Sequence, residues 1–174
     1  IFFSDFEEVK KVINRKIIDT IQGYFNTYIT ITNVHLYRIK KNLNYSPFNL
    51  KSYGSTVAWH NDGSSTDTLK IFFSLNKLGE KDGPMEFISS QQTRDIFRKS
   101  PILMSKKKLI SRVNSYKKML FSGNEAYIIN TNQCLHRAMS PESDHRDLLV
   151  FVCNSHNKKT SFNWEVDSTI NIYK

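Results

Sequence analysis

The sequence contains few cysteines, because Cys134 and Cys153 are the only two in 174 residues. Two cysteines inside strand-like stretches exclude the disulfide framework that is typical of small secreted domains. The chain also lacks an apolar run long enough to cross a membrane, since runs such as 71–73 and 127–129 have only the length of strands. We therefore expect a cytoplasmic protein with no membrane partner.

The sequence also has fewer acidic than basic residues. The chain has 16 Asp and Glu against 25 Lys and Arg, which gives a net charge of +9. This excess favours anionic partners such as phosphates, carboxylates or thioester-linked nucleotide carriers. Because no DNA-binding or RNA-binding motif is present, we expect no nucleic-acid partner. A genome rich in A and T explains the many Lys, Asn and Ile residues equally well.

Several common catalytic patterns are missing. The sequence has no Ser-His-Asp order, no glycine-rich phosphate loop, no four-ligand zinc spacing and no internal repeat. Its hydrophobic content of 39% nevertheless predicts a compact core. We expect residues 1–174 to form one domain, and the initial Ile1 in place of Met predicts further residues upstream.

The most informative pattern that is present is His60-Asn61-Asp62. Successive side chains in a strand alternate between its faces, so His60 and Asp62 project to one side while Asn61 points away. The preceding segment 53–59 favours a strand, and 63–65 breaks it, which places the pair at a strand end. Taken alone, the pattern fits a surface hydrogen bond between histidine and aspartate equally well.

The second half of the chain adds a distal histidine and an arginine. Residues 134–138 and 147–152 have strand composition, and 140–144 consists of turn-forming residues. We therefore predict a hairpin, which would place Arg146 beside the strand that carries His136.

Together these residues indicate a metal site. The two imidazoles of His60 and His136 and the carboxylate of Asp62 leave coordination positions open, as in non-haem Fe(II) sites that activate oxygen. Arg146 offers a fixed cation for a dicarboxylic co-substrate. The remaining histidines lack this context and are interpreted as structural or surface residues: His35, His145 and His156.

The order of elements predicts a mainly β fold. A capping box at Ser4 followed by apolar residues at helical spacing predicts a helix that ends at Gly23 and packs on a sheet. The number of strands that follow is the number a double-stranded β-helix, or jelly roll, requires. These strands are expected at about 33–39, 53–60, 67–75, 84–88, 119–121, 125–130, 134–139 and 146–153, with a possible edge strand within 162–172.

Five pieces of the sequence occur in a familiar order, namely Trp59 to Gly63, Leu69 to Leu75, Glu80 to Ile88, His136 and Arg146. Over about residues 53–153 the chain resembles the phytanoyl-CoA dioxygenase branch of the Fe(II)/2-oxoglutarate-dependent oxygenases. The Asp-Gly-Pro-Met-Glu-Phe-Ile stretch is the most telling piece outside the ligands. The chain departs from the family pattern at Ser89-Ser90-Gln91-Gln92, where Gly-Ser-His is usual, and at Ala138, where many members carry a hydroxyl residue.

The resemblance implies a function. Fe(II) would be held by His60, Asp62 and His136, and 2-oxoglutarate would bind the metal with its far carboxylate paired to Arg146. The activity would be O2-dependent hydroxylation of a small or carrier-linked anionic metabolite, with release of succinate and CO2 and with ascorbate as a candidate reductant. Relatives that halogenate lack the carboxylate ligand, so Asp62 favours hydroxylation.

Other functions remain open from the sequence. A catalytically silent, cupin-like jelly roll could bind a small molecule, and a structural Zn(II) or Ni(II) ion could use the same ligands. The chain could also be one module of a larger biosynthetic protein. Arg146 discriminates between these readings, because a structural metal needs no dicarboxylate anchor.

Two further segments have an open interpretation. The basic stretch 91–118, with Lys106, Lys107 and Lys108, fits either a lid for an anionic substrate or, more simply, a solvated and partly helical surface. Lys70 and Phe72 share a strand face that the resemblance places toward the pocket. Lys70 could supplement Arg146, but we expect an exposed lysine and a core phenylalanine.

Overall fold

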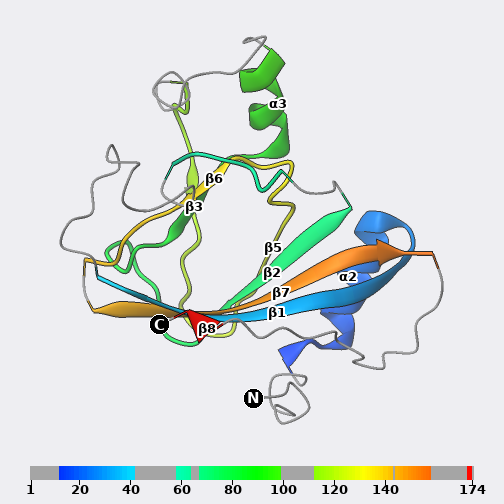
Figure 1. The fold of residues 1–174 in the computed structure, drawn as a ribbon, viewed down its shortest axis with the longest axis horizontal. Coiled ribbons are helices and arrows are strands. Elements are labelled where there is room, and N and C mark those ends of the chain that lie inside the picture. The colour runs from blue at the N-terminus through cyan, green and yellow to red at the C-terminus, as the bar shows by residue number, and fades with distance from the viewer. Residues whose placement is uncertain are drawn as a thin grey trace.

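The computed structural model describes residues 12–41, 58–63, 67–98, 112–142, 144–157 and 172–173. Within them the chain forms two helices and eight strands (Figure 1). The helices are α2 (Arg15–Phe25) and α3 (Ser90–Arg98). The strands are β1 (Tyr28–Lys40), β2 (Thr68–Ser74), β3 (Met85–Phe87), β4 (Lys117–Lys118), β5 (Tyr127–Ile129), β6 (His136–Ala138), β7 (His145–His156) and β8 (Ile172–Tyr173).

The strands form two sheets. The larger sheet has the order β5-β2-β7-β1-β8, and the smaller one has the order β4-β3-β6. From β2 onward the chain moves between them: β3, β4 and β6 belong to the smaller sheet, and β5 and β7 return to the larger one. All pairings are antiparallel except that of β1 with β8. The predicted mainly β class is confirmed, and this arrangement fits a jelly-roll-like fold.

The longest strand pairing in the larger sheet joins β1 and β7. It runs from Tyr28 opposite His156 to Lys40 opposite His145, with a register shift between Ile31 and Asn33. A bulge of this kind moves the following side chains to the opposite face. This explains why Val34 follows Ile29 and Ile31 on the same buried face, although strict alternation from Ile31 would select residue 33.

One hydrophobic cluster lies between the larger sheet and α2. It contains Ile21 of the helix and apolar side chains from three strands: Ile29, Ile31, Val34, Leu69, Ile71, Leu149, Phe151 and Cys153. The prediction that the N-terminal helix packs on a sheet is therefore confirmed. Burial also raises the pKa of the Cys153 thiol to about 12, so this cysteine is an apolar core residue.

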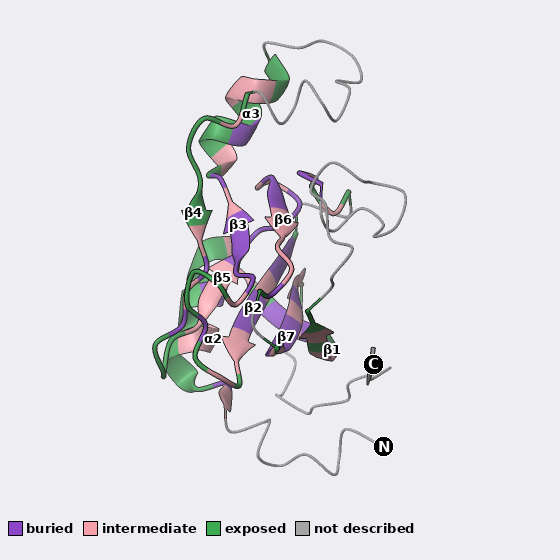
Figure 2. Ribbon diagram, turned by 90° about the vertical axis from the view of Figure 1, so that its left-hand side faces the viewer, coloured by how far each residue is buried: buried purple, intermediate pink, exposed green. Residues whose placement is uncertain are grey.

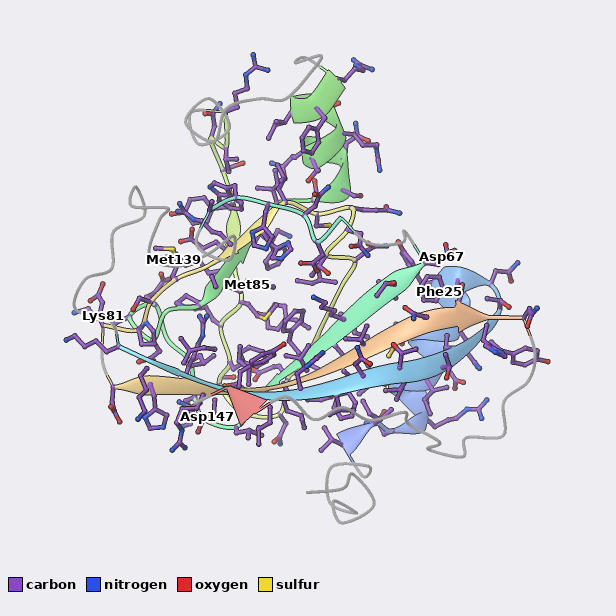
Figure 3. All side chains as sticks on the ribbon, in the orientation of Figure 1. Phe25, Asp67, Lys81, Met85, Met139 and Asp147 are labelled. Carbon is purple, nitrogen blue, oxygen red and sulfur yellow. The ribbon has the colours of Figure 1, made fainter. Side chains whose placement is uncertain are left out.

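A second cluster fills the space between the two sheets. The larger sheet contributes Phe72, Leu148 and Val150, and Met85 faces them from β3 of the smaller sheet. Figure 3 shows side chains filling this space, with Met85 labelled, and Figure 2 shows that the central strands are buried. Because β7 is covered on both faces, Leu148 to Phe151 form a continuous buried run.

An asparagine caps helix α2 at each end. The Asn14 side chain accepts a hydrogen bond from the Ile17 backbone N–H, which caps the first turn. The helix continues through Gly23 to Phe25, and the C-cap Asn26 has a left-handed conformation with φ of 51°. The predicted end at Gly23 is therefore wrong, because asparagine tolerates this conformation as well. The capping box at Ser4 lies outside the described residues.

The predicted hairpin between β6 and β7 is also wrong. Strand β6 pairs with β3 in the smaller sheet, whereas β7 lies between β1 and β2 in the larger sheet. The segment between them crosses from one sheet to the other. Turn-forming residues predict that the chain changes direction, but they do not determine which neighbours each strand then finds.

Several remaining predictions fall partly outside the described residues. The predicted strand 53–60 is described only from residue 58, and the segment 162–172 only at its last residue. The predicted strand at 119–121 is replaced by β4 at Lys117–Lys118 and an isolated bridge between Leu78 and Phe121. Residues 99–111, with Lys106, Lys107 and Lys108, are not described. None of the described helices is long and apolar enough to span a membrane.

Gly83 permits a close contact beside the crossover. A Cβ atom at this position would lie 2.5 Å from the Pro141 nitrogen and 2.6 Å from the Met139 oxygen. Gly63 has the same φ of +67°, but among the described residues no atom lies within 4 Å of such a Cβ. Gly63→Ala is expected to lower the free energy of unfolding by about 1 kcal/mol through backbone strain. Gly83→Ala should lower it by about 2 kcal/mol more, because backbone must move.

Denaturant unfolding of both variants and the wild type measures this difference. Since the two glycines have the same φ, subtracting their effects isolates the contact with residues 139–141. Equal losses of stability would contradict the close packing of the two loops.

Candidate metal centre

The two predicted histidine ligands face each other from adjacent segments. His60 and His136 form an isolated antiparallel bridge, in which the His60 N–H donates to the His136 carbonyl at 3.0 Å and the reverse bond measures 2.9 Å. Their ring centroids lie 4.3 Å apart. Two reciprocal backbone bonds thus hold both imidazoles on the same face.

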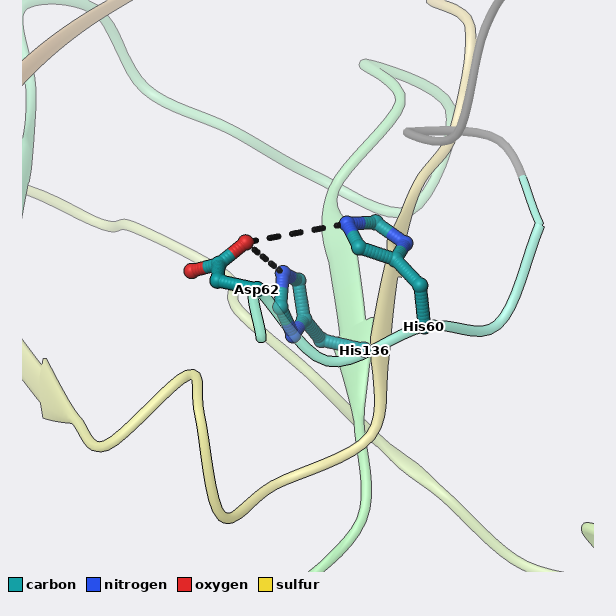
Figure 4. A group of neighbouring side chains, drawn as sticks. All are labelled: His60, Asp62 and His136. Carbon is teal, nitrogen blue, oxygen red and sulfur yellow. Dashed lines mark ion pairs between the residues drawn. The ribbon is translucent and has the colours of Figure 1, made fainter. Parts of the chain in front are cut away.

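Asp62 is brought to this face by the backbone after His60. The Asp62 N–H donates to the Thr131 carbonyl at 3.2 Å, and the intervening Asn61 side chain donates to the Asn132 carbonyl at 3.3 Å. Asp62 Oδ1 lies 3.5 Å from His136 Nε2 and 3.8 Å from His60 Nε2 (Figure 4). The three side chains offer ligand atoms that all lie within 4.8 Å of one another.

Backbone carbonyls determine which histidine nitrogens face the centre. His60 Nδ1 lies 2.7 Å from the Ala58 carbonyl oxygen, and His136 Nδ1 lies 3.0 Å from the Cys134 carbonyl oxygen. Since a carbonyl oxygen only accepts hydrogen bonds, each Nδ1 is the protonated nitrogen. In the neutral ring the lone pair of Nε2 then points toward Asp62, which is the arrangement that metal-bound histidines require.

The charges of the site favour a neutral imidazole beside an ionised carboxylate. Burial lowers the pKa of His60, and the charge of His136 lowers it further. Burial raises the pKa of Asp62, but hydrogen bonds from His136 and Lys70 outweigh burial and hold it well below its usual value. At neutral pH the site therefore offers the neutral imidazole of His60 and the anionic carboxylate of Asp62.

Arg146 lies in the other sheet, on β7. It is 2% exposed, pairs with Ile39 of β1, and lies two residues before Leu148 on the same strand face. Leu148 belongs to the cluster between the two sheets. Phe87 packs against the same cluster, and Phe87 is the residue of β3 that pairs with His136. Arg146 and His136 therefore face the same interior from opposite sheets. The prediction that Arg146 lies beside the strand that carries His136 is wrong.

Lys70 lies next to the candidate metal centre, whereas the sequence favoured an exposed lysine over a role beside Arg146. Its Nζ lies 2.8 Å from Asp62 Oδ2, and its side chain is only 28% exposed. The expectation of an exposed lysine is wrong because β2 is the second strand in from the edge of the larger sheet, with its inner face against the interior. Because Lys70 and Phe72 lie on the same face of one strand, the sequence did contain a signal that Lys70 points inward. Phe72 is a core residue, as expected.

An ion pair and a cation–π contact support the segments that carry His60 and His136. Arg137, next to His136, lies with its guanidinium 4.9 Å from the centroid of the Trp59 ring, next to His60. Its Nε donates to Glu86 of β3 at 2.6 Å, and this carboxylate side chain is only 4% exposed. These contacts join the strand that carries His136 to β3 and to the segment that carries His60. The sequence pattern contained no signal for these contacts.

The departure from the family pattern at Ser89 to Gln92 has a structural role. Ser89 Oγ accepts from the Gln92 N–H at 3.1 Å, and Gln92 Oε1 accepts from the Ser89 N–H at 3.1 Å. This reciprocal capping box begins α3. Among the other histidines, His145 lies in a partly exposed cluster with Asp144 and Asp147, as expected for a surface residue.

Comparisons with known proteins show the fold. The structure is similar to that of HygX from Streptomyces hygroscopicus, which was solved with nickel, 2-oxoglutarate and hygromycin B bound. The TM-score is 0.51 at 11% sequence identity, and the match covers 84% of this chain and 64% of HygX. No protein-family model matches the chain, and no curated protein matches it at a significant level. The chain thus shares a fold with a protein that binds a metal and 2-oxoglutarate.

Proposed function

We propose that the chain is an Fe(II)- and 2-oxoglutarate-dependent oxygenase that hydroxylates a small or carrier-linked molecule. The observation that carries this proposal is the convergence of His60 Nε2, His136 Nε2 and Asp62 Oδ1, with each Nδ1 engaged by a backbone carbonyl. The likeness of fold to HygX supports it. We assign the two sheets to a double-stranded β-helix, because the strands move between them in the order such a fold requires.

The residues fit a divalent metal of the first transition row. Two imidazoles and one carboxylate on one side of an ion form the facial set of non-haem Fe(II) oxygenases. Around one ion these atoms would lie closer together than the observed 3.5 and 3.8 Å, so a small inward movement of Asp62 is sufficient. A structural zinc site would more often supply a fourth protein ligand, and the cluster among the described residues offers three.

The residues also fit a dicarboxylic co-substrate. Arg146 provides a buried guanidinium on the interior face of β7, where a carboxylate could be bound by two parallel hydrogen bonds. Bound Fe(II) and 2-oxoglutarate together supply O2-dependent decarboxylation to succinate and CO2, coupled to hydroxylation of a C–H bond. The apolar side chains between the sheets, such as Phe72 and Val150, exclude water beside this space.

The finer assignment rests on the sequence. The stretch Asp82 to Ile88 and the spacing of the four site residues support the phytanoyl-CoA dioxygenase branch, with ascorbate as reductant. The net charge of +9 supports an anionic substrate, and two cysteines that form no disulfide fit the cytoplasm.

The direct test is formation of succinate. Purified protein with Fe(II), ascorbate, O2 and 2-oxoglutarate should release succinate slowly without a primary substrate and faster when a screened anionic metabolite is accepted. Asp62→Ala should abolish both rates. A wild-type protein that binds metal tightly but never consumes 2-oxoglutarate with any screened metabolite would instead support a silent binding module with a structural metal.

A further inference from the structure

Lys70 is held close to the candidate metal centre by the middle of a sheet. It lies on β2, where it pairs with Ile129 of β5 on one side and Val152 of β7 on the other. A strand with neighbours on both edges fixes the position from which a side chain starts. The ammonium therefore reaches Asp62 from a rigid base rather than from a loop.

The two oxygens of the Asp62 carboxylate have different partners. Oδ2 lies 2.8 Å from Lys70 Nζ, whereas Oδ1 lies 3.5 Å from His136 Nε2 and 3.8 Å from His60 Nε2. A charge-assisted hydrogen bond orients the carboxylate so that one oxygen faces the histidines. A carboxylate without such a partner can turn and chelate a metal with both oxygens.

We propose that Lys70 is a positioning residue that holds Asp62 as a one-oxygen ligand and so keeps an additional coordination position open. This inference rests on the proposed metal centre and extends it. With one oxygen from Asp62 and one nitrogen from each histidine, about three of six octahedral positions stay open. 2-Oxoglutarate requires two of them and oxygen requires one. Chelation by both oxygens of Asp62 would remove one of these positions.

The proposal also assigns a direction to the effect on metal affinity. A fixed ammonium beside the carboxylate competes with the metal for negative charge. Its removal should therefore strengthen metal binding and at the same time weaken the binding of 2-oxoglutarate to the metal. If Lys70 only stabilised the fold, its removal would not strengthen metal binding while weakening 2-oxoglutarate binding.

The experiment counts water molecules on Mn(II) bound in place of iron. Broadening of Mn(II) electron paramagnetic resonance lines in ¹⁷O-labelled water should indicate about three bound waters in the wild type and about two in Lys70→Met. The variant should bind Mn(II) more tightly and bind 2-oxoglutarate to the Mn(II) protein roughly tenfold more weakly. Lys70→Arg, which can still donate to Oδ2, should keep the wild-type water count.

Lys118→Met is a control, because Lys118 also forms an ion pair, with the exposed Glu80, but lies on β4, which β3 separates from the strand that carries His136. It should leave the water count and both affinities unchanged.

Equal water counts in the wild type and in Lys70→Met would overturn the proposal for Lys70 alone. A wild type that holds Mn(II) with about three waters but binds no 2-oxoglutarate would overturn the proposed function and leave the water comparison valid. A wild type that binds no Mn(II) would overturn both.

Discussion

Asp62→Ala is expected to weaken the binding of divalent metal by roughly 100-fold or more, because it removes the one anionic ligand of the set. The two histidines would remain, held by their reciprocal backbone bonds at 3.0 and 2.9 Å. The fold should survive, since the Asp62 side chain is 21% exposed and lies outside the hydrophobic clusters. Calorimetric titration with Mn(II) under anaerobic conditions measures the loss.

Two further variants separate ligation from general charge. Asp62→Asn keeps the size of the side chain and loses the charge, so most of the affinity should be lost in this variant as well. Asp19→Ala removes a carboxylate on α2 that pairs with Arg15 in an exposed ion pair, and it should bind metal as the wild type does. Wild-type affinity in Asp62→Ala would mean that Asp62 is no ligand, and the metal centre would then have to be abandoned.

Arg146→Ala is expected to weaken 2-oxoglutarate binding by roughly 30-fold to 1000-fold, because a two-pronged ion pair in a partly dry interior contributes on the order of 2–4 kcal/mol. Metal binding should change little, since Arg146 is not one of the three candidate ligands. Lysine should restore binding only in part, because an ammonium does not reproduce the planar guanidinium. Titration of 2-oxoglutarate into the Mn(II) protein measures the effect.

Arg38→Ala is the matched control for this variant. Arg38 lies on β1 and forms two hydrogen bonds with Asp147, but its side chain is 56% exposed. Its removal should leave 2-oxoglutarate affinity unchanged. Because Arg146 is buried, thermal unfolding of Arg146→Ala must show a folded protein before the comparison is made. Undiminished 2-oxoglutarate binding by folded Arg146→Ala would place the anchor elsewhere, and Lys70 would be tested next.

Local pattern in the sequence was sufficient to select the three candidate ligand residues that the structure brings together. His60 and Asp62 are two residues apart, and alternation of side chains along an extended segment puts both on one face. Strand-forming residues around His136 predicted the strand that carries it, and the structure brings its ring to 4.3 Å from that of His60. The mainly β class likewise followed from apolar alternation and turn residues. These properties depend on neighbours in the chain, which a sequence displays directly.

Tertiary structure decided which strands meet and therefore what surrounds the site. The turn after β6 leads into the opposite sheet, so Arg146 approaches the interior across the sheets rather than from the next strand. The pairing of β2 between β5 and β7 directs Lys70 to Asp62 and takes it away from solvent. Arg137 meets Trp59 only because the two ligand segments are bridged. Such contacts join residues far apart in the chain, and they depend on sheet order, which the local pattern of the sequence did not determine.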